Sequence, residues 1–153
     1  MTPADIDARF TFAIDLAREA GALALGYFRD LASLEVKSKG PQDVVSEADV
    51  RTEQLIRDRI SAAFPDDAFL GEESGAHGID GADAIWVIDP IDGTQPFVSG
   101  LPSWCISIAF VAGGEMTIGV VFAPVLDELF AARRGTGATL NGRTIRVKDA
   151  SSL

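Results

Sequence analysis

The chain has 153 residues, of which 13 are Lys or Arg and 23 are Asp or Glu, so its formal net charge is −10. One histidine, His77, and one cysteine, Cys105, are too few for a Cys/His zinc site, a disulfide framework or a Cys-His nucleophile pair. The negative charge argues against a nucleic-acid partner, whereas abundant carboxylates suit hard cations such as Mg²⁺, Mn²⁺ or Ca²⁺.

Hydrophobic residues make up 47% of the sequence, which at this length is enough to bury the core of one domain. No apolar run approaches the roughly 18 residues that span a bilayer. Residues 1–5 also lack the basic and apolar regions of a signal peptide. We therefore expect a cytoplasmic protein without a membrane partner.

Two helices are predicted in the first part of the chain. Apolar residues recur at three- and four-residue steps over residues 6–28, which is typical of one long amphipathic helix. A second helix is predicted over residues 47–63, with Ser46 as its N-cap and Pro65 behind its end. Its periodicity places Leu55, Ile56 and Ile60 inward and Arg51, Glu53, Arg57 and Asp58 outward.

Strands dominate the remainder. A short apolar stretch at residues 68–70 leads into a polar loop at 71–75. Residues 75–78 are interpreted as a loop with His77 on the surface, and residues 79–83 carry no periodicity. Residues 84–89 have the composition of a buried strand, and further strands are predicted over residues 104–111, 116–123 and 128–132. Asn141-Gly142 predicts a two-residue hairpin turn. Two helices followed by turn-linked strands indicate an α+β fold with a mainly antiparallel sheet.

The segment over residues 86–94 carries the clearest chemical signal, because a buried strand runs directly into Asp89, Pro90, Asp92 and Gly93. Two carboxylates about 4 Å apart repel by roughly 4 kcal/mol at an effective dielectric constant near 20. The segment contains no basic residue, so a divalent cation is the most economical partner. Asp-Pro and Asp-Gly pairs are also ordinary turn sequences, and that interpretation stays open for each pair alone.

Several further motifs occur in order along the chain: Asp-Val-Val-Ser-Glu-Ala-Asp at 43–49, Phe-Leu-Gly-Glu-Glu-Ser at 69–74, and the segments 124–130 and 137–142. Together with the acidic segment they resemble the inositol monophosphatase family, which comprises Mg²⁺-dependent, Li⁺-sensitive phosphomonoesterases related to fructose-1,6-bisphosphatase. The resemblance implies that residues 1–153 form the N-terminal α+β domain, the front part of a layered αβαβα sugar-phosphatase fold. The C-terminal α/β domain of the family is then absent from this chain.

The resemblance also implies a metal site. Glu72, Asp89 and the backbone carbonyl of Ile91 would bind a first Mg²⁺. Asp89 would bridge to a second ion that Asp92 also binds. Two or three Mg²⁺ ions, or Mn²⁺ ions, are expected in the intact enzyme.

The catalytic residues implied by the resemblance are Asp49, Thr94 and Glu72. Asp49 would accept a hydrogen bond from Thr94, whose hydroxyl orients the nucleophilic water. Asp92 and the amides of Gly93 and Thr94 would bind phosphate. Two basic residues, Lys37 and Lys39, would lie on a mobile loop over the metals.

The implied function is hydrolysis of a small phosphate monoester, similar to inositol monophosphate, by metal-activated water without a covalent phosphoenzyme. Gln95-Pro96-Phe97 departs from the family pattern x-Asn-Phe, and Pro96 removes one backbone donor near the expected phosphate cradle. Histidinol phosphate and nucleotides of the 3′-phosphoadenosine type therefore stay open as substrates.

Length is the second departure, because family members are much longer and their second half supplies the last metal-ligating aspartate. We expect the chain to be truncated and, alone, inactive or weakly active. The rival interpretations are a non-catalytic metal-binding remnant and a phosphate sensor without turnover. We also expect self-association through uncovered apolar surface, and a homodimer for the intact protein.

Overall fold

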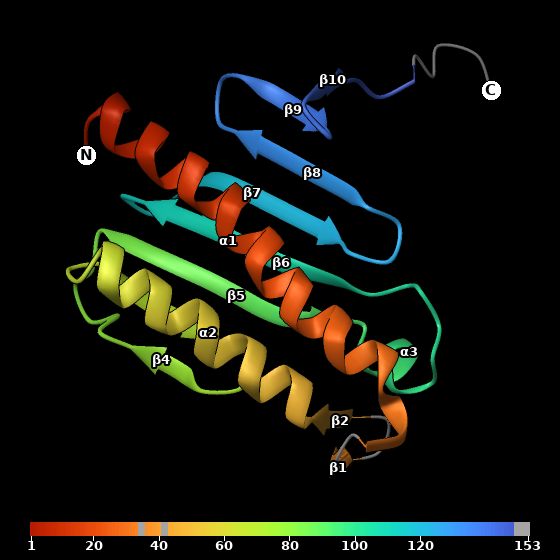
Figure 1. The fold of residues 1–153 in the computed structure, drawn as a ribbon. Coiled ribbons are helices and arrows are strands. Elements are labelled where there is room, and N and C mark those ends of the chain that lie inside the picture. The colour runs from red at the N-terminus through yellow and green to blue at the C-terminus, as the bar shows by residue number, and fades with distance from the viewer. Residues whose placement is uncertain (34–35, 41–42, 149–153) are drawn as a thin grey trace.

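The computed structural model describes the backbone of residues 1–33, 36–40 and 43–148 and the side chains of residues 1–32 and 46–148. Two long helices, α1 and α2, lie side by side, and a short hairpin joins them (Figure 1). The first part of the chain contains α1 (Pro3–Arg29), the 3₁₀ helix η1 (Leu31–Ser33), β1 (Val36–Gly40), β2 (Asp43–Ser46) and α2 (Glu47–Ala63).

An eight-stranded sheet follows, in the spatial order β10-β9-β8-β7-β6-β5-β3-β4. Its strands are β3 (Ala68–Gly71), β4 (Gly75–His77), β5 (Ala84–Asp92), β6 (Cys105–Ala112), β7 (Glu115–Ala123), β8 (Glu128–Arg133), β9 (Gly137–Leu140) and β10 (Arg143–Ile145). The short helix α3 (Thr94–Val98) connects β5 to β6. Within the described sheet β3 and β5 are parallel and every other pair is antiparallel, so the predicted α+β class with a mainly antiparallel sheet is confirmed.

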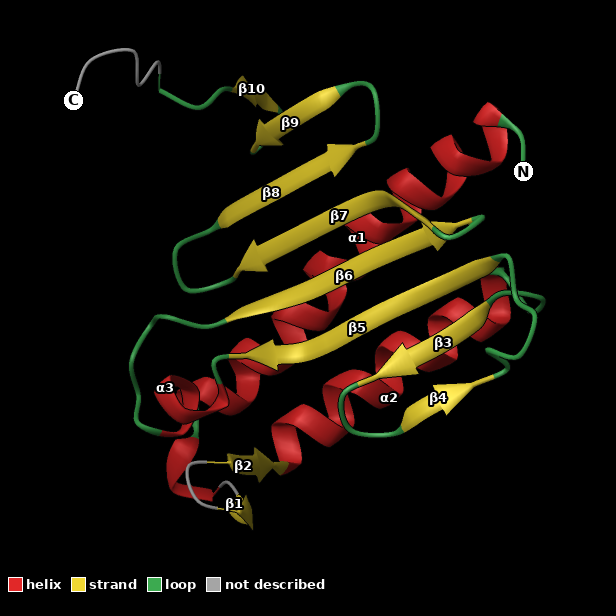
Figure 2. Ribbon diagram, turned by 180° about the vertical axis from the view of Figure 1, so that it is seen from behind, coloured by secondary structure: helices red, strands yellow, loops and turns green. Residues whose placement is uncertain are grey.

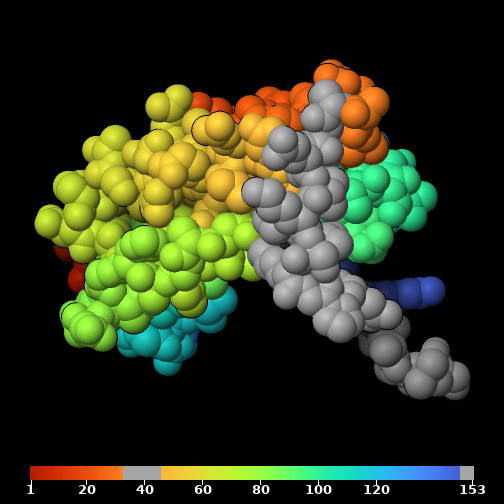
Figure 3. All heavy atoms as spheres, turned by 90° about the horizontal axis from the view of Figure 1, so that it is seen from below, coloured from red at the N-terminus to blue at the C-terminus, as the bar shows by residue number. Residues whose placement is uncertain are grey.

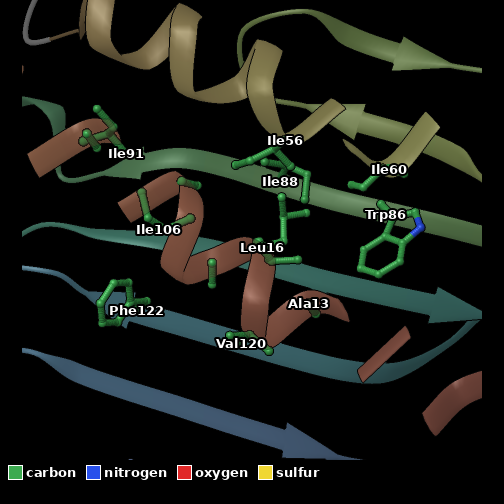
Figure 4. Close-up of a cluster of buried hydrophobic side chains, with 14 of the residues drawn as sticks. Ala13, Leu16, Ile56, Ile60, Trp86, Ile88, Ile91, Ile106, Val120 and Phe122 are labelled. Atoms are coloured by element: carbon green, nitrogen blue, oxygen red, sulfur yellow. The ribbon is translucent and has the colours of Figure 1, made fainter. Parts of the chain in front are cut away.

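Both long helices cover the same face of the sheet, and the core lies between them and the strands (Figures 1 and 2). Alternate residues of the central strands point into this layer, including Trp86 and Ile88 of β5 and Ile106 of β6. They meet side chains such as Leu16 of α1 and Ile56 of α2 (Figure 4). No helix in the described residues combines the length and apolar character that a membrane crossing requires.

Local signals explain where the helices begin and end. Thr2 and Asp5 form a capping box at the start of α1. Glu47–Ala63 are the predicted bounds of α2, which ends two residues before Pro65. Asn141 and Gly142 have φ angles of 48° and 78°, as a type I′ hairpin turn requires.

Two details of the sequence prediction are wrong. Glu53 points inward and is only 2% exposed, because backbone N–H groups of a neighbouring turn pair its carboxylate. Residues 75–77 form β4, an edge strand that pairs with β3. Its polar and glycine-rich sequence gives no strand signal, since the pairing depends on backbone hydrogen bonds. His77 is exposed there, as predicted.

The close approach of α1 to the sheet requires glycine at position 21. A Cβ on Gly21 would lie 2.5 Å from Cδ1 of the Phe122 ring and 2.9 Å from Cγ of Pro124. Gly26, in the same helix, has no atom within 4 Å of the equivalent position. The helix therefore rests directly on β7 at Gly21.

We predict that Gly21→Ala lowers the free energy of unfolding by about 1–3 kcal/mol, because the added methyl overpacks the contact with Phe122. Gly26→Ala should raise it by about 0.5–1 kcal/mol through helix propensity alone. Urea denaturation of both variants measures the difference. Equal effects at the two positions would contradict this packing.

The face of the sheet opposite α1 and α2 is not covered by either of these helices (Figure 2). Val121 and Phe130, paired across β7 and β8, are each 37% exposed. An uncovered apolar face of this kind favours association.

We predict that the chain self-associates as its concentration rises and that Phe130→Lys reduces this association. Light scattering over a concentration series provides the measurement. Arg134→Lys, an exposed change without loss of charge, serves as the control. A wild-type chain that stays monomeric throughout the series would refute the prediction.

Candidate metal centre

The parallel pairing of β3 with β5 places Glu72 beside Asp89. Gly71 pairs with Ile88, and the backbone N–H of Glu72 donates a 3.1 Å hydrogen bond to the carbonyl of Ile88. Glu72 directly follows the last residue of β3, and Asp89 follows Ile88 within β5. The two residues are therefore neighbours across the parallel pair, and their carboxyl groups interact through a hydrogen bond.

A β-bulge brings Asp92 to the same face. Asp89 pairs with Ser107 of β6 and Asp92 pairs with Cys105, so three steps along β5 oppose two steps along β6. In a regular strand residues three apart face opposite sides. The extra residue reverses the alternation, so Ile91 enters the core, and Asp92, which is exposed, lies on the same side as the half-buried Asp89. Glu72, Asp89 and Asp92 form the acidic cluster.

Glycine is required immediately after the acidic segment. Gly93 has a φ of 100°, and a Cβ there would lie 2.8 Å from the carbonyl oxygen of Ser103. The first hydrogen bond of α3 runs from the N–H of Phe97 to the carbonyl of Gly93. The N–H groups before it have no partner within the helix. Pro96 lies in this first turn, where its missing N–H removes no bond from the helix.

Asp49, at the start of α2, connects the helix to this turn. Its Oδ1 accepts a 2.9 Å hydrogen bond from the hydroxyl of Thr94, which is the bond predicted from the sequence. Its Oδ2 accepts from the backbone N–H of Ser46 at 2.8 Å and from the Ser46 hydroxyl. The carboxylate of Asp49 is fully buried, so these bonds fix its orientation.

Like charges in the acidic cluster repel one another and shift the ionisation of Asp89. Burial, hydrogen bonding with Glu72 and repulsion from Glu72 and Asp92 raise the pKa of Asp89 to about 7. One oxygen of this carboxyl, Oδ1, is buried without a hydrogen-bond partner. Burial and the nearby charges of Asp92 and Asp89 also raise the pKa of the Cys105 thiol to about 11. None of the described arginine or lysine side chains pairs with the cluster.

These oxygens fit a hard divalent cation such as Mg²⁺ by their chemistry. Among the described side chains, no three His, Cys, Asp or Glu residues already surround one point as metal ligands. The acidic cluster therefore supplies negative charge and one oxygen without a hydrogen-bond partner. Its side chains must move to coordinate an ion. The side chains of Lys37 and Lys39, on β1, lie outside the described residues.

Glu53 is the residue near this site that the sequence prediction missed. It lies one helical turn after Asp49, and each of these buried acids contacts a segment of the site. Two acids four residues apart share one face of a helix. That spacing is the signal that could have placed Glu53 inward.

Comparison with known proteins agrees with the sequence motifs. The sequence pattern of the inositol monophosphatase family matches residues 5–153. A histidinol-phosphatase from Chlorobaculum parvum is 47% identical over 135 residues, which cover 88% of this chain and 51% of that protein. The Nus factor SuhB of Xylella fastidiosa is 42% identical over 140 residues, covering 92% of this chain and 50% of that protein.

The fold gives the same relationship. The structure of the IMPase from Thermotoga maritima superposes with a TM-score of 0.87 at 41% sequence identity, covering 95% of this chain and 56% of that one. The chain thus spans about half the length of the relatives it matches.

We predict that Asp89→Asn stabilises the metal-free chain at pH 8 by about 2 kcal/mol. This is half of the free energy that corresponds to the full pKa shift, because solvent screens a carboxyl that is only half-buried. In the wild-type fold Asp89 holds a proton that the unfolded chain releases from about pH 4. The stability due to this proton is present below pH 4 and is lost as the pH rises through about 7.

Chemical denaturation in EDTA between pH 4 and 8 tests this pH dependence. The slope of stability against pH should be shallower in Asp89→Asn than in the wild type. Asp66→Asn, at an exposed acid, serves as the control. Identical slopes in wild type and Asp89→Asn would contradict the raised pKa.

Proposed function

The chain belongs to the inositol monophosphatase family, and from that membership we propose that its acidic cluster binds Mg²⁺ for hydrolysis of a small phosphate monoester. The observation that carries the proposal is the state of Asp89. Its carboxyl is half-buried beside two other acids, has one buried oxygen without a partner and meets no described basic side chain. A cation at this point would satisfy both the oxygen and the charge.

The residues that would hold the metal come from two strand ends. Glu72 from β3, and Asp89 with Asp92 from β5, would supply carboxylate oxygens. The carbonyl of Ile91 accepts a 3.1 Å hydrogen bond from the Thr94 hydroxyl and keeps a second lone pair for a cation. When bound, a pair of Mg²⁺ ions would activate water and stabilise the leaving oxygen of the ester.

Thr94 and Asp49 would orient the attacking water. The Thr94 hydroxyl has its hydrogen directed at Asp49 Oδ1 or at the carbonyl of Ile91, so its lone pairs remain to accept a proton from water. Ser46 holds the other oxygen of Asp49, which fixes the carboxylate that faces the Thr94 hydroxyl. This arrangement directs the water and provides a route for its proton through Thr94 to Asp49.

Backbone amides at the start of α3 would bind the phosphate group. The N–H groups of Gly93 and Thr94 lie next to Asp92 and before the first hydrogen bond of α3. Amides at a helix start attract anions. Pro96 removes one further donor from this turn, so fewer amides are present for the substrate than in a turn without proline.

Two substrates are proposed for the hydrolysis. An inositol monophosphate follows from the family, and histidinol phosphate is supported by the 47% identity to a histidinol-phosphatase. A relative named as a Nus factor raises the question of a nucleic-acid partner. The net charge of −10 opposes direct binding of nucleic acid, so we still predict that the chain has no nucleic-acid partner.

A second candidate, metal binding without turnover, is supported by the length of the chain. It spans about half of its relatives, and the acidic cluster is not closed around one point in the described residues. In this case the chain would bind Mg²⁺ weakly and release no phosphate from either ester. The two candidates share the metal site and differ in turnover.

We predict that Asp92→Asn weakens Mn²⁺ binding by about 10–100-fold, because it removes a ligand charge from the cluster. Asp92 is exposed, so circular dichroism should be unchanged. Calorimetric titration with Mn²⁺ gives the affinities, and Asp58→Asn, which removes an exposed charge from α2, is the control.

Phosphate release from inositol 1-phosphate and from histidinol phosphate in Mg²⁺ then separates the two candidates. Turnover of either ester that Asp92→Asn abolishes supports hydrolysis, whereas binding without turnover supports the second candidate. A wild-type chain that does not bind Mn²⁺, or an Asp92→Asn variant that binds it equally well, would overturn the metal assignment.

A further inference from the structure

Glu53 is a buried carboxylate directed at the turn that carries Glu72. It lies in the first half of α2 and is 2% exposed. Its Oε2 accepts a 2.8 Å hydrogen bond from the backbone N–H of Glu73, and its Oε1 accepts one of the same length from the N–H of Ser74. Each carboxylate oxygen therefore holds one of the two amides that follow Glu72.

The end of β3 is shaped to admit this carboxylate. A Cβ on Gly71 would lie 2.5 Å from both the carboxyl carbon and Oε2 of Glu53. Gly71 has no positive φ, so its backbone tolerates other residues and the contact with Glu53 is what requires glycine. From below, α2 and the β3–β4 segment form adjoining surfaces, in agreement with these contacts (Figure 3).

Among the described residues, the partners of the Glu53 carboxylate are backbone N–H groups. No described arginine, lysine or histidine forms an ion pair with it. An ionised carboxylate is costly to bury unless strong hydrogen bonds replace water. Two adjacent N–H groups converge on one carboxylate only in a particular turn conformation. Burial of Glu53 therefore favours that conformation of the turn.

Hydrogen bonds therefore hold the backbone at Glu72 and immediately after it. Its own N–H is bound to the carbonyl of Ile88 on β5, and the next two amides are bound to Glu53. On the same face of α2, one turn earlier, Asp49 holds Thr94. One helix thus holds both segments of the site, the turn after β3 and the turn after β5.

We propose that Glu53 is a positioning residue that fixes the Glu72 carboxylate against Asp89 and so determines the affinity of the acidic cluster for metal. Glu53 does not touch the metal; it acts through the 71–75 turn. The inference rests on the proposed metal site, but the contact with the turn can be measured without metal.

Two variants disturb the contact from opposite sides. Glu53→Gln keeps the shape of the side chain but replaces one accepting oxygen with an NH₂ group that faces a backbone N–H. Gly71→Ala leaves Glu53 intact and displaces its carboxylate with a methyl group. Asp58→Asn removes a negative charge from the exposed side of the same helix and is the matched control.

Hydrogen exchange and Mn²⁺ titration are measured on the 153-residue chain and on each variant. In the wild type and Asp58→Asn the amides of Glu73 and Ser74 should be protected from exchange. Both test variants should lose that protection and bind Mn²⁺ at least about 10-fold more weakly, while protection of the central strands stays unchanged. If Glu53→Gln fails to fold, Gly71→Ala provides the same comparison.

The outcomes distinguish this inference from the proposed function. Loss of amide protection together with weaker Mn²⁺ binding supports it. If the wild type binds Mn²⁺ and the variants bind it equally well, the positioning role is wrong and the metal site stands. If the wild type does not bind Mn²⁺, the metal site fails and the positioning role fails with it. Exchange of the two amides that is fast in the wild type would refute the contact itself.

Discussion

Repulsion between like charges governs the architecture at the carboxyl ends of β3 and β5. Parallel pairing and a bulge bring Glu72 and Asp92 near enough to Asp89 that both raise its pKa. Asp89 has a raised pKa and one buried oxygen without a hydrogen-bond partner, so a proton retained on Asp89 offsets part of the repulsion. A folded chain retains such an arrangement most readily where a cation offsets the charge.

The core of the domain keeps these acids in register. β5 is an interior strand, with β3 on one side and β6 on the other, and its inward residues pack under α1 and α2. Gly21 allows α1 to lie directly on β7, and the capped start of α2 holds Asp49 against Thr94. Packing far from the acidic cluster therefore fixes strand positions, and strand positions fix the carboxylates.

The sequence predicted the elements that have strong local signals. Alternation and periodicity gave both long helices, the central strands and the Asn141-Gly142 hairpin, and the motifs gave the family. The acids were also identified, but their convergence was not derivable from spacing. Asp89 and Asp92 would face opposite sides without the bulge, and Glu72 meets Asp89 through a parallel pairing that local sequence does not encode. Charge normally indicates exposure to solvent and so predicts Glu53 outward, whereas the backbone of a turn 20 residues away pairs its carboxylate.

We propose that a divalent cation binds the acidic cluster. A crystal of the chain grown with Mn²⁺, examined by anomalous scattering at a wavelength near the manganese edge, tests this most directly. We expect an anomalous peak within coordination distance of carboxylate oxygens from Glu72, Asp89 and Asp92. A peak elsewhere on the chain, or Mn²⁺-free acids with Asp89 protonated against Glu72, would contradict it.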